Sequence, residues 1–130
     1  MDTKAVGELN PVTLAYIGDA VFSLYVRSRV VHEADYKADE ATGKANSCVK
    51  ATAQSAMLER IMPMLTESEA DVVRRGRNCH TPQKAKNAGL MDYKRATALE
   101  ALLGWLYLRK EYPRLKEICD ECVKDFFRGD

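Results

Sequence analysis

The chain has 130 residues and a formal net charge of +1, which is the size of one ordinary domain and leaves no room for a second. Hydrophobic residues make up 46% and charged residues 30% of the chain, a composition that excludes a disordered protein. No apolar run is long enough to span a bilayer, and the first residues lack the pattern of a secretory signal. We therefore expect no membrane contact and a cytoplasmic location, where the four cysteines stay as thiols.

The order of helix signals predicts an all-α protein of one domain, residues 1–130, with five main helices. Asn10-Pro11 is typical of a helix start, and Pro63 is expected to end the second helix. Thr66-Glu67-Ser68-Glu69 has the pattern of a capping box. Residues 78–91 are expected to form a loop, after which Asp92 caps the next helix. The expected helices cover about 11–31, 38–61, 67–77, 93–109 and 113–127.

Positive charge is concentrated in one stretch, residues 74–95, which we call the basic segment. It carries a net charge of +6, whereas residues 1–73 carry −4 and residues 96–130 carry −1. A local basic patch on a nearly neutral protein indicates a defined contact with a polyanion. The alternative interpretation is an ordinary solvated charged surface.

Two of the expected helices are apolar on all sides, and each contains a single carboxylate near its middle, Asp19 or Glu100. Such a carboxylate is costly to bury unless it is paired or binds a metal. The neighbouring residues are small, Gly18 and Gly104 among them, and leave space for something to approach. Two interpretations stay open at this point. Each acid is paired with an arginine or a hydroxyl, or the two together hold a hard cation.

Cys119 and Cys122 are spaced as in many zinc sites. A zinc site needs four ligands, and no second cysteine pair follows, although Cys48, Cys79 and His80 could complete the set. Both residues fall on the apolar stripe of the last helix, so we predict core thiols and no zinc.

Three segments together resemble the catalytic domain of the ribonuclease III family. Residues 14–21, Leu-Ala-Tyr-Ile-Gly-Asp-Ala-Val, resemble its signature helix, and residues 98–108, which include Glu100, resemble its second acidic helix. The stretches 74–82 and 84–87 are similar to those of the Mini-ribonuclease III branch, whose members lack a separate double-stranded-RNA-binding domain. The resemblance covers about residues 7–128.

The resemblance implies a dimeric, all-helical hydrolase, an endonuclease that cuts double-stranded RNA with Mg²⁺, for which Mn²⁺ can substitute. Products would carry 5′-phosphate and 3′-hydroxyl ends. Asp19 and Glu100 match the family's catalytic metal ligands. Two further acidic positions of the larger enzymes are Ala15 and Thr97 here. Waters and RNA phosphates are therefore expected to complete the coordination of the metal.

The family's known task implies the substrate, precursor large-subunit (23S) ribosomal RNA in bacteria, and hence a role in rRNA processing and ribosome biogenesis. A-form RNA is recognised largely through shape, phosphates and 2′-hydroxyls, for which the basic segment supplies donors. One alternative is a non-catalytic double-stranded-RNA-binding protein on the same fold, and another is a zinc-stabilised helical adaptor. The expected RNA-binding residues are Arg74, Arg75, Arg77, Asn78, His80, Thr81, Lys84, Lys86 and Asn87.

We also expect a homodimer, because three amphipathic helices cannot easily cover two fully apolar ones, and two-fold symmetry is the commonest way to supply the cover. The helix face with Tyr16, Phe22 and Val26 is the candidate interface. The competing interpretation assigns this face to the core of one subunit.

Overall fold

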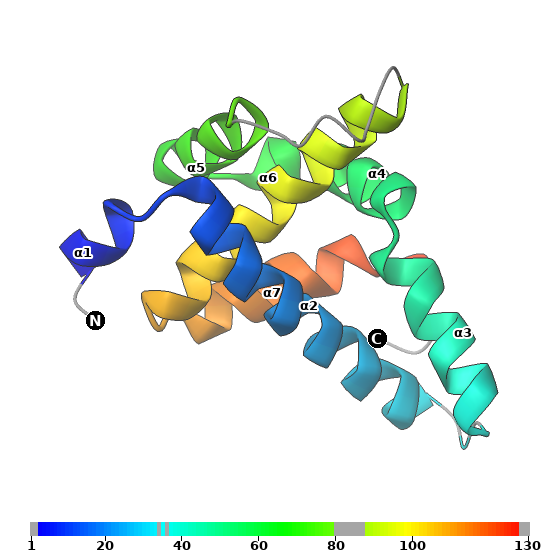
Figure 1. Cartoon of the computed structure of the whole chain (residues 1–130). Coiled ribbons are helices and arrows are strands. Elements are labelled where there is room, and N and C mark those ends of the chain that lie inside the picture. The colour runs from blue at the N-terminus through cyan, green and yellow to red at the C-terminus, as the bar shows by residue number, and fades with distance from the viewer. Residues whose placement is uncertain (1–2, 34, 36, 80–87, 128–130) are drawn as a thin grey trace.

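The computed structural model describes residues 3–33, 35, 37–79 and 88–127, and all the regular secondary structure in these ranges is helical, which confirms the all-α prediction. No helix within the described ranges is both long and apolar enough to cross a membrane. The elements, in chain order (Figure 1), are α1 (Thr3–Gly7), α2 (Pro11–Glu33), α3 (Ala38–Val49), α4 (Ala51–Ile61), the 3₁₀ turn η1 (Met62–Met64), α5 (Glu67–Arg77), α6 (Ala88–Leu108) and α7 (Tyr112–Cys122).

Two helix starts form as their sequences predict. Asn10 Oδ1 accepts a hydrogen bond of 2.8 Å from the backbone N–H of Val12, so Asn10 caps α2. At α5, the Thr66 hydroxyl accepts from the N–H of Glu69 at 3.1 Å, and the Glu69 carboxylate accepts from the N–H of Thr66 at 2.9 Å. The reciprocal pair confirms the capping box.

Other boundaries differ from the expected ones. The helix expected over 38–61 is two helices, because Lys50 has extended backbone angles (φ −69°, ψ 154°). This break lets α3 pack on α2 while α4 packs on α6. Helix α6 begins at Ala88 rather than Tyr93, so Asp92 lies inside it and is not its cap. The short α1 was not expected, and α7 runs over Tyr112–Cys122 instead of 113–127.

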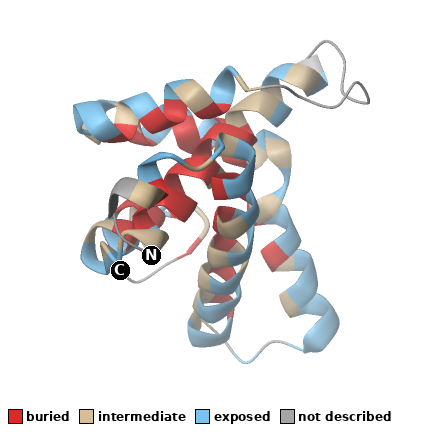
Figure 2. Cartoon of the chain, turned by 60° about the vertical axis from the view of Figure 1, so that its left-hand side comes forward, coloured by how far each residue is buried: buried red, intermediate tan, exposed pale blue. Residues whose placement is uncertain are grey.

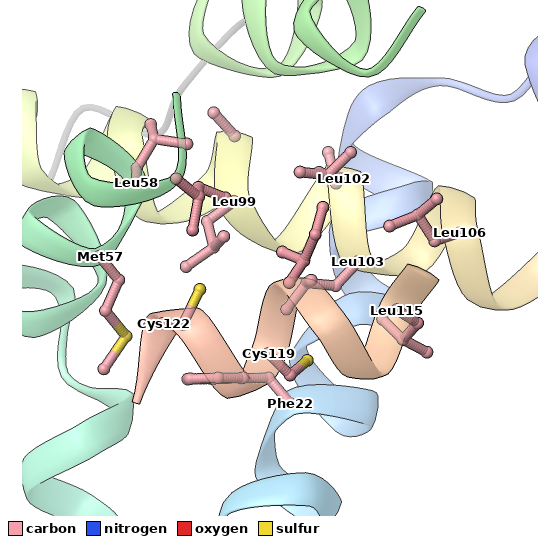
Figure 3. Close-up of a cluster of buried hydrophobic side chains, with 14 of the residues drawn as sticks. Phe22, Met57, Leu58, Leu99, Leu102, Leu103, Leu106, Leu115, Cys119 and Cys122 are labelled. Carbon is pink, nitrogen blue, oxygen red and sulfur yellow. The ribbon is translucent and has the colours of Figure 1, made fainter. Parts of the chain in front are cut away.

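Helix α6 is the centre of the molecule and packs against α2, α4, α5 and α7. Figure 2 shows buried residues gathered where these helices meet, while α2 and α3 lie side by side and extend beyond that region with largely exposed surfaces. Leu99, Leu102, Leu103 and Leu106 of α6 are fully buried. Figure 3 shows Cys119 and Cys122 of α7 in the same cluster. The two cysteines are therefore core thiols, and burial raises the pKa of Cys122 to about 12.

The candidate interface on α2 is wrong for two of its three residues. Phe22 and Val26 are completely buried within one subunit, because they continue the line of contact between α2 and the core. Tyr16 is 78% exposed, and Leu24, on the side of the helix away from Phe22 and Val26, is 69% exposed. The uncovered surface of α2 therefore includes Tyr16 of the predicted face but not Phe22 or Val26.

Candidate active site

Two glycines let α2 and α6 cross with their backbones in contact. A Cβ atom on Gly18 would lie 1.7 Å from the backbone oxygen of Glu100, and one on Gly104 would lie 1.9 Å from the backbone oxygen of Leu14. No real side chain fits at such distances. The space beside Gly18 and Gly104 is therefore filled by the neighbouring helix. For these two residues, this corrects the expectation that the space is left for an approaching ligand.

This crossing places Asp19 and Glu100 in one open cavity of about 350 Å³. Ala15 and Thr97, which stand where the larger enzymes carry further acids, line the same cavity. The Thr97 hydroxyl donates to the backbone oxygen of Tyr93 at 2.9 Å. The cavity is completed by Val12, Tyr16, Cys79 and Tyr93.

The two carboxylates differ in their surroundings. Asp19 is exposed and Glu100 is half-buried, so the prediction of two buried acids holds only in part. Burial, followed by the hydrogen bond and the negative charge of Asp19, raises the pKa of Glu100 to about 8, and a hydrogen bond from Gln54 acts in the opposite direction. The two carboxylates therefore lie close to each other, on neighbouring helices. This arrangement favours the cation interpretation over two acids that are each paired with an arginine or hydroxyl.

The donor set fits a hard divalent cation. No group of three or more His, Cys, Asp and Glu side chains able to hold a metal occurs within the described ranges, so the protein offers two carboxylates. Mg²⁺ is commonly held by one or two carboxylates while it keeps several waters and binds substrate phosphates. Two adjacent carboxylates provide oxygen ligands and negative charge of this kind.

The described part of the basic segment begins beside this cavity. Arg74, Arg75 and Arg77 form the last turn of α5, and Asn78 follows as its C-cap. Cys79, the next residue, lines the cavity with Asp19 and Glu100. The predicted RNA-binding residues His80, Thr81, Lys84, Lys86 and Asn87 lie outside the described residues.

The three arginines are not equivalent. Arg74 pairs with Asp71 at 2.5 Å, and Arg75 donates to the backbone oxygen of Leu9 at 3.4 Å and is half-buried. Arg77 is exposed. Cations in the last turn also stabilise a helix through its dipole, so Arg75 and Arg74 have structural roles beside any contact with a polyanion.

The fold and a family match define the class of protein. The family model described as Ribonuclease III domain matches residues 12–111, a span that contains both carboxylates and the glycine crossing. The chain belongs to the ribonuclease III family and is an endoribonuclease.

The chain is similar to several relatives from one branch of this family, the Mini-ribonuclease 3 proteins. The chain is similar to a Mini-ribonuclease 3 of Symbiobacterium thermophilum, with 41% identity over 121 residues that cover 93% of each protein. A Mini-ribonuclease 3 of Brevibacillus brevis is 43% identical over 112 residues, which cover 86% of this chain and 84% of that protein. A crystal structure of a Fusobacterium nucleatum protein superposes with a TM-score of 0.80 and 29% identity, and covers 91% of this chain and 94% of that one.

Sequence reasoning missed Gln54 as a neighbour of Glu100. Gln54 lies on α4 at helical spacing from Leu58 and Ile61, which are both buried. A single amide on an otherwise apolar stripe is the signal that could have identified it. Tyr93 and Cys79 at the cavity wall carry no comparable signal, because their position depends on how α5 and α6 pack.

Proposed function

We propose that the protein is a divalent-metal-dependent endoribonuclease that cuts double-stranded RNA, with Mg²⁺ as its natural ion and Mn²⁺ as a substitute. The observation that carries the proposal is the pair Asp19 and Glu100 in one cavity, on two helices that a glycine crossing holds in place. A bound divalent cation supplies an activated water and stabilises the leaving oxygen in phosphodiester hydrolysis.

The chain's own residues would have two roles, to bind the cation and to contact the phosphates of the RNA. Asp19 and Glu100 would bind the cation. The carboxyl of Glu100, whose pKa is raised to about 8, would lose its proton when the cation binds, because only the ionised carboxylate is a metal ligand. Arg77 and Asn78 stand directly before Cys79 at the cavity wall. They would contact RNA phosphates next to the bond that is cut. The products would carry 5′-phosphate and 3′-hydroxyl ends.

We further infer a homodimer, which would place two cavities on one duplex. The supporting observation is an apolar groove of about 530 Å³ between α2, the end of α6 and α7, with Leu24 69% exposed on its surface. Exposed apolar grooves of this kind typically mark protein interfaces. Ala20 lines the groove while its neighbour Asp19 lines the carboxylate cavity, so a two-fold axis at the groove would bring two active sites close together. The groove residues are Ile17, Ala20, Val21, Leu24, Tyr25, Ser28, Tyr107, Tyr112 and Leu115.

The substrate that we propose is precursor 23S ribosomal RNA, on the strength of the resemblance to the Mini-ribonuclease III branch. The test is to incubate the protein with long duplex RNA, with a single-stranded RNA of equal length and with a transcript of the 23S precursor ends. Each is run with Mg²⁺ and with a chelator. Mg²⁺-dependent cutting of the duplex substrates alone is the expected result. Binding of duplex RNA without cutting under all conditions would contradict the proposal and leave the non-catalytic alternative.

A further inference from the structure

The chemistry proposed for the cavity does not use the group that distinguishes RNA from DNA. A water oxygen attacks the phosphorus and the 3′-oxygen leaves, so the 2′-hydroxyl of the ribose stays intact. This hydroxyl both donates and accepts hydrogen bonds, and proteins use it to tell the two nucleic acids apart. An endoribonuclease of this type therefore selects RNA by shape or by contacts, and a contact needs a free polar side chain beside the bond that is cut.

Four of the side chains that line the cavity are unsuited to such a contact. Val12 and Ala15 carry only hydrocarbon side chains, and Asp19 and Glu100 are the proposed metal ligands. A carboxylate that binds a cation has its oxygens engaged, and its charge also repels the phosphates on either side of a ribose. A contact to the sugar therefore comes from the remaining residues of the cavity.

Two of the remaining side chains already have partners. Thr97 is buried, and its hydroxyl donates to the backbone oxygen of Tyr93 at 2.9 Å. Cys79 Sγ donates to the backbone oxygen of Gly76 at 3.0 Å. Tyr16 and Tyr93 also line the cavity, and no hydrogen bond joins either phenol to another described residue. A phenol both donates and accepts, which matches the 2′-hydroxyl of a ribose.

Tyr93 is the better placed of the two tyrosines. It precedes Thr97 by four residues and Glu100 by seven on α6, a spacing that puts all three on one face of the helix. Tyr93 is 37% exposed, whereas Tyr16 is 78% exposed. A side chain that the fold already covers loses less conformational freedom when it binds a ligand. Tyr93 thus offers the more ordered ring, on the helix that carries Glu100.

We propose that Tyr93 is a specificity-determining residue, whose phenol forms a hydrogen bond with the 2′-hydroxyl of a ribose next to the bond that is cut. The inference rests on the proposed function of the carboxylate pair, because Tyr93 lines the same cavity as Asp19 and Glu100. The contact recognises the sugar and leaves the cation to the two carboxylates. Its loss therefore weakens the preference for ribose without changing metal affinity.

A contact to a phosphate is the competing explanation, because a phenol also donates to phosphate oxygens. The two contacts respond differently to the sugar, since removal of one 2′-hydroxyl abolishes the first and leaves the second. The measurement is kcat/KM in Mg²⁺ for a set of short duplex RNAs. One duplex has ribose throughout, and each of the others has a single 2′-deoxynucleotide at a different position around the cut site. Wild type and Tyr93→Phe are compared on the whole set.

We expect one position at which the 2′-deoxynucleotide lowers kcat/KM of the wild type by about 2–10-fold, the range for a single hydrogen bond. Tyr93→Phe should lose a similar factor on the all-ribose duplex and nothing further at that position, because both changes remove the same bond. Tyr16→Phe is the matched control, since it removes the other phenol of the cavity and should keep the wild-type response to the deoxynucleotide. Mn²⁺ affinity without RNA and the unfolding temperature of Tyr93→Phe should equal those of the wild type.

Equal responses of wild type and Tyr93→Phe to every 2′-deoxynucleotide overturn the assignment of Tyr93. If the variant is also slower by one factor on all duplexes, the contact is to a phosphate instead. A wild type that tolerates a deoxynucleotide at every position overturns the assignment as well. These outcomes leave the proposed function intact, because the wild type still cuts duplex RNA with Mg²⁺. A wild type that cuts no duplex overturns the proposed function and the role of Tyr93 together.

Discussion

Gly18 and Glu100 touch through their backbones, since a Cβ atom on Gly18 would lie 1.7 Å from the Glu100 oxygen. This contact lies directly beside Asp19 and at Glu100 itself, so the helix crossing and the carboxylate pair depend on each other. A side chain at residue 18 would push α2 away from α6 and separate the acids along with the helices.

Gly18→Ala should therefore destabilise the protein by about 3 kcal/mol or more, at the upper end for overpacked cores. Gly43→Ala is the control, because Gly43 lies inside α3 with nothing within 4 Å of an added Cβ. That substitution should stabilise the protein by about 0.5–1 kcal/mol through helix propensity. Urea unfolding of both variants measures the difference, and equal stability for the two would refute the close crossing.

Asp19→Asn and Glu100→Gln should each reduce cleavage of duplex RNA by about 10²-fold or more, the scale seen when one group that stabilises transition-state charge is lost. Folding should be retained. Asp19 is exposed, and an amide at residue 100 replaces a carboxyl whose pKa of about 8 leaves it largely uncharged at pH 7. Turnover assays at saturating Mg²⁺, with circular dichroism and duplex binding as controls, check this. Wild-type turnover by either variant would remove that residue from the active site.

The all-α class, the start of α2 and the capping box could be predicted because they depend on local signals such as Asn10-Pro11 and Thr66. The carboxylate pair could be identified because Asp19 and Glu100 interrupt strongly apolar helices. The break at Lys50 could not be predicted, because no proline or glycine marks it. The buried state of Phe22 could not be predicted either, because a helix that is apolar all round does not show which face meets the core. That choice is made by Gly18 and Gly104, whose role appears only when α2 and α6 are packed together.

Replacing Arg74, Arg75 and Arg77 by alanine should weaken duplex binding and flatten its salt dependence. Each lost phosphate contact removes roughly 0.7–0.9 from the log–log slope. Arg77→Ala alone tests this without structural loss, because Arg77 is exposed, whereas Arg75 is tied to the backbone of Leu9. Lys124→Ala is the control, because Lys124 is an exposed cation near the C-terminal end of the described chain. Binding by the triple variant with an unchanged salt slope would place the RNA on another surface.

Light scattering at micromolar concentration should report about twice the 14.6 kDa of one chain, because a second subunit would bury the exposed apolar groove at Leu24. Leu24→Asp should shift the protein to monomers by placing a charge in that groove. Val31→Asp is the matched control, since Val31 is 74% exposed on the same helix but does not line the groove. A wild-type protein that stays monomeric while it cuts RNA would contradict the dimer and require one strand to be cut at a time.

Metal binding should strengthen with rising pH up to about pH 8 and then level off. The pKa of Glu100, raised by burial and by Asp19, is about 8 in the metal-free protein. Below that pH the carboxyl carries a proton that the cation must displace, so each pH unit costs up to about tenfold in affinity.

Titrations with Mn²⁺ at pH 7, in two buffers of different ionisation enthalpy, should show release of close to one proton per bound ion. In Glu100→Gln no proton remains to be displaced at this position, so any residual Mn²⁺ binding should lose this pH dependence. Binding by the wild type without proton release would show that Glu100 is already ionised in the metal-free protein.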